Sequence, residues 1–229
     1  MELYKIRGGS KAELQARKYN IGVAISLGNK WFSVENTAEL VRWALQYSRE
    51  SVVVYAADTI HAINLEVRNR IPYDKAVRSA TGKGREILSK VEEYIKINFR
   101  PDEAEKVFYA TWKDLDDSTY KRKVNYLYGL FESSVAFAEA LKAIVRNQIA
   151  KEERKFSEED VSKFATYILE ELPECISRVP VRGIPCDAYA YPFDGELAQF
   201  VERIQQGEEF PEIKANILDT KPKVFFEVR

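Results

Sequence analysis

Two short apolar runs, one on each side of an amphipathic segment, constrain the fold of this sequence more than any other feature. They read NIGVAIS at 20–26 and SVVVYAAD at 51–58, and in both the apolar residues are continuous rather than alternating. Strands of this kind are buried on both faces, as in a parallel sheet that helices cover on each side. We therefore expect a single Rossmann-like, doubly wound α/β domain over residues 1–229, with a mainly parallel sheet.

The apolar spacing predicts further helices and strands along the chain. Between the two runs, NTAELVRWALQYS opens with Asn36 and carries Glu39 three residues later, which is a capping-box pattern. Pro173 is expected to end a helix at residue 172, because proline cannot donate the helical hydrogen bond. Further helices are expected at 59–69, 73–98, 118–154, 158–172 and in GELAQFVERIQ, and further strands in AEKVFYATW, IPCDAYAYP and KVFFEV.

The composition is that of an ordinary globular protein, but the charge is unevenly spread. Hydrophobic residues make up 45% of the chain and charged residues 31%, and no apolar run approaches the roughly 20 residues of a membrane span. The charged N-terminus lacks the apolar core of a secretory signal, so we expect a cytoplasmic protein. The formal net charge is −1, yet residues 68–90 hold seven basic residues against two acidic ones. This stretch is either a solvated helix face or a surface for nucleic acid.

A single histidine and two cysteines limit the catalytic options. His61 would have to supply the base of any Ser-His-Asp triad, and its place in an apparent helix favours a packing or surface role. Cys175 and Cys186 lie 11 residues apart and match no metal-binding spacing, and a zinc site built on histidines is close to excluded. We therefore expect no metal.

The common cofactor and hydrolase motifs are absent. SLGN, after the first apolar run, holds one glycine where a dinucleotide fingerprint needs three, and no phosphate-binding loop ends in Gly-Lys-Ser/Thr. Ser26 also lacks the glycine two residues earlier that marks a hydrolase elbow, because Ala24 stands there. Hydride transfer, ATP use and ordinary serine hydrolysis thus lose support, and we expect neither a cofactor nor ATP.

Three features remain after these exclusions. Ser26 ends the first buried run, at the edge where open parallel sheets form their sites. In YILEELP, Tyr167 and Glu171 lie four residues apart and share a helix face, with Glu171 in what reads as the last turn. In CDAYAYP, Tyr189 and Tyr191 stand two residues apart on an expected strand. Taken one at a time, these residues also fit a turn residue, a surface acid and core aromatics.

In this order the three features resemble the tRNA-dependent cyclodipeptide synthases. Members of that family carry Gly-hydrophobic-Ser-Pro-x-Asn-Ser-Tyr-Phe after a strand, and VAISLGNKWF keeps Ser26, Asn29 and Phe32 in register. Their Tyr-x-x-x-Glu-x-Pro motif is similar to YILEELP. The pair Tyr191–Pro192 would place the chain in the Tyr-Pro branch of the family. The resemblance covers most of the chain.

This chain departs from the family pattern around the serine. Ala24 and Leu27 stand where glycine and proline are usual, and Lys30 and Trp31 replace serine and tyrosine. These changes bear on the shape of the first substrate pocket rather than on the nucleophile. The family is similar in fold to the catalytic domain of class I aminoacyl-tRNA synthetases but lacks their ATP-binding signatures, which implies a substrate that arrives already activated.

The resemblance implies a ping-pong reaction of two aminoacyl-tRNAs that yields a cyclic dipeptide, a 2,5-diketopiperazine. Ser26 would attack the ester of the first aminoacyl-tRNA, and the second would then accept the acyl group to form a dipeptidyl-tRNA. Tyr167 and Glu171 would hold the first α-ammonium group, with Glu171 also acting as a base. Tyr191 would serve proton transfer in cyclisation or orient the ester near Ser26. Asn29 would either donate to the oxyanion or shape the turn.

Two further sets of residues and one further partner follow from the same resemblance. A tailoring oxidase or methyltransferase is the implied partner that acts on the product. The pocket for the first aminoacyl group is expected at strand ends, lined by Ala24, Val54, Tyr189 and Pro192. A tRNA acceptor stem is bound mainly through its phosphates, for which the basic stretch supplies Arg68, Lys75, Arg78, Lys83 and Arg85.

Two other functions stay open from the sequence alone. A serine hydrolase or acyltransferase would act on small esters without tRNA, and it would need His61 close to Ser26. A non-catalytic tRNA-binding module would keep the basic helix and would tolerate the loss of Ser26 or of Glu171.

Overall fold

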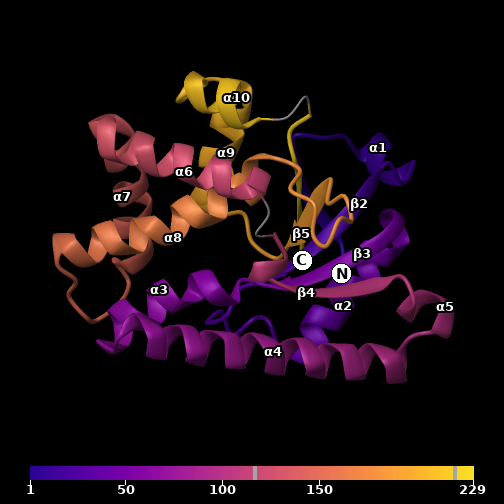
Figure 1. Ribbon diagram of the computed structural model, residues 1–229. Coiled ribbons are helices and arrows are strands. Elements are labelled where there is room, and N and C mark those ends of the chain that lie inside the picture. The colour runs from indigo at the N-terminus through magenta and orange to yellow at the C-terminus, as the bar shows by residue number, and fades with distance from the viewer. Residues whose placement is uncertain (116–117, 219–220) are drawn as a thin grey trace.

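A six-stranded sheet forms the centre of the protein (Figure 1). The computed structural model describes residues 1–115, 118–218 and 221–229. The strand order is β1-β6-β5-β2-β3-β4, and neighbouring strands are parallel except β1 and β6. The expected mainly parallel sheet is therefore confirmed. The strands are β1 (Leu3–Arg7), β2 (Tyr19–Ile25), β3 (Ser48–Ala56), β4 (Val107–Thr111), β5 (Ala188–Tyr191) and β6 (Val224–Val228).

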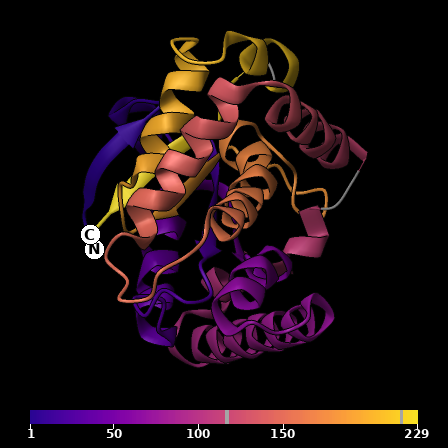
Figure 2. The same ribbon diagram turned by 90° about the vertical axis from the view of Figure 1, so that its left-hand side faces the viewer.

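Helices cover both faces of this sheet. Helices α2 and α4 pack on one face, where they bury alternate residues of the central strands such as Val23 and Val54. Helices α3 and α8 lie on the other face, and Figures 1 and 2 show α6 to α10 grouped on that side, away from α4. The helices are α1 (Lys11–Gln15), α2 (Val34–Tyr47), α3 (Asp58–Asn69), α4 (Tyr73–Asn98), α5 (Pro101–Ala104), α6 (Ser118–Ser133), α7 (Val135–Ile149), α8 (Glu158–Ile176), α9 (Glu196–Gln206) and α10 (Pro211–Ile217), with a 3₁₀ helix at Trp112–Leu115.

Serine side chains set two helix starts that the sequence prediction placed wrongly. Ser33 accepts the backbone N–H of Asn36 over 3.1 Å and caps α2, so the expected cap at Asn36 is wrong. Ser134 accepts the N–H of Phe137 over 3.3 Å and caps α7. The region expected as one helix at 118–154 is therefore two helices.

Helix α8 continues past the proline at which the sequence predicted its end. It runs through Pro173 to Ile176. A proline inside a helix costs about 3 kcal/mol, because it removes a hydrogen bond and crowds the preceding turn. Leu172 and Ile176, on either side of it, are completely buried, and this burial offsets the cost. Glu171 therefore lies inside the helix and not in its last turn.

Four short elements, β1, α1, α5 and α10, escaped the sequence prediction. Only Arg7 of β1 is buried, and polar residues interrupt its sequence, so the strand lacks the continuous apolar pattern of the central strands. It pairs antiparallel with β6, and backbone hydrogen bonds join Glu2 to Arg229. Among the helices that the structure describes, none combines the length and the apolar character needed to cross a membrane.

Candidate active site

Ser26 stands on a tight turn at the carboxyl end of β2. The backbone N–H of Asn29 donates to the carbonyl of Ser26 over 3.2 Å, and Gly28 adopts a φ of +136°, which disfavours any side chain. The side-chain oxygen of Asn29 accepts the N–H of Trp31 over 3.0 Å. These contacts hold the partly exposed serine at the edge of the sheet.

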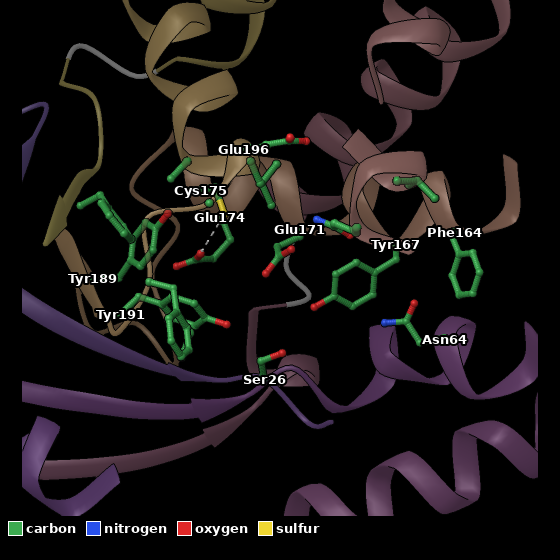
Figure 3. A pocket seen from close by; sticks show the side chains of 18 of the residues that line it. Ser26, Asn64, Phe164, Tyr167, Glu171, Glu174, Cys175, Tyr189, Tyr191 and Glu196 are labelled. Atoms are coloured by element: carbon green, nitrogen blue, oxygen red, sulfur yellow. Dashed lines mark hydrogen bonds between the residues drawn. The ribbon is translucent and has the colours of Figure 1, made fainter. Parts of the chain in front are cut away.

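Tyr167, Glu171 and Tyr191 converge on Ser26 from two other elements (Figure 3). Tyr167 and Glu171 lie one turn apart on α8, and Tyr191 ends β5. Burial, with a further contribution from the Glu171 carboxyl, raises the pKa of Tyr167 well above its usual value and that of Tyr191 to about 12. Interaction with the Ser26 hydroxyl opposes this rise in both tyrosines. The two phenols are thus protonated at neutral pH and lie close to the serine.

These side chains line a cavity of about 350 Å³ beneath α8. The ring of Phe32, the last residue of the serine motif, packs 5.4 Å from that of Tyr191 and so supports one wall. A cavity with mostly apolar walls and a few convergent polar groups suits a small organic group. Besides the polar residues around Ser26, its lining includes Ala24, Trp112, Phe164, Tyr189, Phe193 and Phe225.

Glu171 presents a carboxyl group to this cavity. Within residues 1–115, 118–218 and 221–229, no side chain forms an ion pair with it, and burial raises its pKa to about 7. A buried carboxylate is costly unless a cation or a hydrogen-bond donor accompanies it. The position is therefore suited to a ligand that brings an ammonium group.

A second, open space meets the cavity at Ser26. It is a groove of about 980 Å³ between the serine turn, α3, α4 and the end of α7. Ser26, Asn64, Arg68 and Gln148 line both spaces, so a group bound at the serine can extend from the cavity into the groove. Four cationic side chains line the groove against two acidic ones, namely Lys30, Arg68, Lys83 and Lys90 against Glu86 and Glu152.

Two residues that were expected to line the first pocket lie elsewhere. Val54 faces the core beneath α2, because it is one residue from Tyr55, whose side chain faces α8. Pro192 lines a separate surface hollow. The expectation is wrong for both. For Val54 the reason is that neighbouring residues of a strand face opposite sides of the sheet, and the prediction chose the wrong side. Ala24 and Tyr189 do line the cavity.

The five basic residues expected to contact tRNA occupy two different settings. Arg68, near the end of α3, pairs with Glu152 and lies over the ring of Phe164, 4.9 Å from its centre. It is therefore held in place at the junction of cavity and groove. Lys83 also lines the groove. The four on α4 are exposed: Lys75, Arg78, Lys83 and Arg85.

His61 lies beneath the serine turn and lines the groove. A Cβ placed on Gly28 would sit 3.0 Å from its ring, so the glycine is needed for space as well as for its backbone angle. Burial lowers the pKa of His61 to about 4, with a further contribution from the charges of Lys83 and Arg68. The imidazole is therefore neutral at pH 7. In the part of the chain that the structure describes, no cluster of three or more His, Cys, Asp or Glu is arranged to hold a metal ion.

Sequence reasoning missed a buried ion pair that borders the cavity. Glu174 lines the cavity one turn beyond Glu171, is only 2% exposed and pairs with Lys223. It also accepts a hydrogen bond from the hydroxyl of Tyr55 over 2.5 Å. The three-residue step from Glu171 could have placed Glu174 on the same helix face. No local pattern links it to Lys223, which lies 49 residues further along the chain.

Comparisons with known proteins agree with this geometry. The family model described as cyclodipeptide synthase matches residues 9–209. A cyclo(L-leucyl-L-phenylalanyl) synthase of Streptomyces noursei is 24% identical over 207 residues, which are 89% of this chain and 85% of that protein.

Solved structures share the fold. A cyclodipeptide synthase from Bacillus thermoamylovorans has a TM-score of 0.75 at 20% identity, over 100% of this chain and 97% of that chain. One from Candidatus Glomeribacter gigasporarum, bound to Phe-tRNAPhe, has a TM-score of 0.55 at 16% identity, over 92% and 88%. A Mycobacterium tuberculosis protein, whose structure demonstrates the relation of cyclodipeptide synthetases to type I tRNA synthetases, has a TM-score of 0.65 at 16% identity, over 85% and 83%.

The expected likeness to class I synthetases is thereby confirmed at the level of the fold. The family model spans most of the chain, from the start of α1 to beyond α9. This chain belongs to the cyclodipeptide synthase family, and is accordingly a tRNA-dependent aminoacyltransferase.

Proposed function

We propose that this chain joins the aminoacyl groups of two aminoacyl-tRNAs into a cyclic dipeptide, with Ser26 as the nucleophile. The observation that carries the proposal is the position of Ser26, where the cavity that holds the Glu171 carboxyl meets a groove lined by cations. An aminoacyl-tRNA has the matching parts, with an ammonium group and a side chain on one side of its ester and a phosphate chain on the other. Ser26 lies where the ester between them would be bound.

In the first step, the hydroxyl oxygen of Ser26 attacks the carbonyl carbon of the ester. The bond to the 2′- or 3′-oxygen of the tRNA breaks, the serine proton passes to that oxygen, and an aminoacyl-serine ester forms. Glu171 holds the α-ammonium group by a charge-assisted hydrogen bond, and the hydroxyl of Tyr167 adds a second contact. The ester is already activated, so the step needs no ATP.

In the second step, the amine of another aminoacyl-tRNA attacks the aminoacyl-serine ester, which frees Ser26 and leaves a dipeptidyl-tRNA. Glu171 takes the proton from that amine and passes it to the departing oxygen of Ser26, and a pKa of about 7 suits such a base at neutral pH. The free amine of the dipeptide then attacks the remaining ester, and the cyclic dipeptide and tRNA separate. Tyr191 transfers a proton in this cyclisation, as its contact with Ser26 allows.

Asn29 positions the site in this proposal. Its side-chain oxygen accepts the N–H of Trp31, and its side chain interacts with the phenol of Tyr191. Asn29 thereby links the serine turn to the tyrosine that serves cyclisation.

The groove and the exposed face of α4 would bind the tRNA. Lys83 and Lys90 of α4 line the groove itself, and Lys75, Arg78 and Arg85 stand exposed elsewhere on the same helix. The Glomeribacter protein, a cyclodipeptide synthase of similar fold, is bound to Phe-tRNAPhe, which supports aminoacyl-tRNA as the ligand. Aminoacyl-tRNAs are cytoplasmic, so the enzyme would act there and pass its product to a tailoring oxidase or methyltransferase.

Mass spectrometry of culture medium tests the proposal. Bacteria that express the wild-type chain should release new diketopiperazine masses, and those that express Ser26→Ala should not. Turnover of small model esters without tRNA would instead support a serine hydrolase. Product formation by well-folded Ser26→Ala would reject the acyl-enzyme altogether.

A further inference from the structure

The cavity runs along the sheet, away from Ser26 and towards Glu174. Ser26 follows the carboxyl end of β2, whereas Lys223, the partner of Glu174, directly precedes β6 and lies at the amino end of that strand. Tyr191 and Tyr189 lie between these two ends on β5. An acyl group attached to Ser26, with its ammonium at Glu171, would therefore direct its side chain towards Glu174.

One oxygen of the Glu174 carboxylate is fully used, and the other is not. Oε1 accepts the hydroxyl of Tyr55 over 2.5 Å and pairs with Lys223, whose side chain is completely buried. Among the contacts of the described residues, only the thiol of Cys175 approaches Oε2, at 3.9 Å, and a thiol is a weak donor. Figure 3 shows this carboxylate between the side chains of Tyr189 and Glu171. Oε2 of Glu174, on a side chain that is more than nine-tenths buried, thus faces the cavity and can accept a further hydrogen bond.

The walls beside Glu174 are aromatic. Tyr189 packs edge-on against Phe225, with ring centres 5.0 Å apart, and both line the cavity together with Trp112. A flat apolar side chain fits between such walls, but an entirely apolar one would leave the acceptor without a donor.

We infer that Oε2 of Glu174 accepts a hydrogen bond from the side chain of the first aminoacyl group, so that this site selects an aromatic side chain ending in a donor, of which tyrosine is the simplest. The inference rests on the proposed function and names the substrate class of the same site. Sites built to bind a substrate hydroxyl strongly reject the analogue that lacks it. Because Glu174 keeps Tyr55 and Lys223 in either case, we expect a preference of about 10- to 100-fold for tyrosyl over phenylalanyl.

The test is the rate at which Ser26 is acylated by Tyr-tRNA and by Phe-tRNA, two substrates whose acyl groups differ by one hydroxyl. Acid-quenched samples are weighed by intact-protein mass spectrometry, and a pool of all charged tRNAs is examined in parallel. Faster acylation by tyrosyl, and a pool product whose side chain carries a donor, support the inference. Equal or faster acylation by phenylalanyl overturns it, while the proposed function survives. Absence of acylation by every member of the pool overturns the proposed function itself.

A paired substitution separates selection from folding. Removal of Glu174 alone would leave the buried Lys223 unpaired, which is strongly destabilising. The double variant Glu174→Leu/Lys223→Met removes both charges together and should remain folded, as checked by circular dichroism and thermal melting. It should lose the preference for tyrosyl, whereas Glu159→Gln, an exposed glutamate on the same helix, should keep it. An unchanged preference in the folded double variant would show that Glu174 does not select the substrate.

Discussion

The cavity and the groove that meet at Ser26 are built in opposite ways. The cavity lies between α8 and the ends of β2 and β5, and its lining combines aromatic side chains with buried polar groups such as Glu174. The groove is open, and Lys30, Lys83 and Lys90 stand exposed along it. Buried contacts discriminate between chemical groups, whereas exposed charges attract any polyanion and weaken with salt. We therefore expect the cavity to select the amino acid and the groove to bind the tRNA that carries it.

Loss of Ser26, at which the two spaces meet, should have the largest effect. Ser26→Ala should lower cyclic dipeptide formation by about 10³-fold or more, because no acyl-enzyme can form. Affinity for tRNA should stay unchanged, since the groove is intact. Acylation is measured by intact mass and binding by fluorescence anisotropy, with Ser133→Ala on α6 as the matched control. A large loss of tRNA affinity in Ser26→Ala would contradict the division between the two spaces.

Glu171→Gln should stabilise the protein at high pH. The folded pKa of about 7 lies above the ordinary value of 4.5, so ionisation favours the unfolded chain between these two values. The free energy of unfolding of the wild type therefore falls from pH 4.5 to about pH 7, by about 3 kcal/mol in total. The variant avoids this loss and should be more stable at pH 8 but equal at pH 4. Urea unfolding at both pH values measures the difference, and equal stability at pH 8 would disprove the assignment.

The same carboxyl should give acylation a pH dependence. Glu171 binds the substrate ammonium only when ionised, so kcat/KM for acylation should fall about tenfold between pH 8 and pH 6. Glu171→Gln should show a low rate without this fall. Quenched-flow measurements across this range test the point, and a flat profile for the wild type would remove Glu171 from the binding of the ammonium group.

Single cations of the groove should have the smallest effect. Lys83→Ala should weaken tRNA binding by only a few-fold at moderate salt and reduce the slope of log K against log salt by less than one. Amino acid selection should not change. The control is Lys106→Ala, an exposed lysine outside both spaces. A change in the cyclic dipeptide produced by Lys83→Ala would show that the groove also takes part in selection.

The sequence predicted the residues around Ser26 better than those at the far end of the cavity, around Glu174. Ser26, Tyr167, Glu171 and Tyr191 belong to short motifs, and the structure brings them together. Val54 was misplaced, because a fully apolar strand does not reveal which of its residues face which side. The central strands were predictable because they are apolar throughout, whereas β1 was missed because polar residues interrupt its sequence.

The surroundings of Glu174 could not be predicted, because its partners are distant from it in the sequence. Glu174 looked like one more acid on α8, and only the fold brings to it Tyr55 of β3 and Lys223, which directly precedes β6. Pro173 misled the prediction of the helix end for a similar reason, since tertiary packing rather than local propensity carries α8 to Ile176.

Helix α8 also fixes the spacing between the groups that we expect to contact the substrate. Tyr167, Glu171 and Glu174 follow one another at four and three residues, which correspond to steps of about 6 and 4.5 Å along the helix axis. Because all three residues belong to one helix, the distances between them do not depend on the conformation of a loop. A β-amino acid places its amine one carbon, about 1.5 Å, further from the ester carbon that Ser26 would attack, so its amine and side chain would reach Glu171 and Glu174 at altered spacings. We therefore expect the fixed spacing of these two residues on the helix to disfavour lengthened substrate backbones.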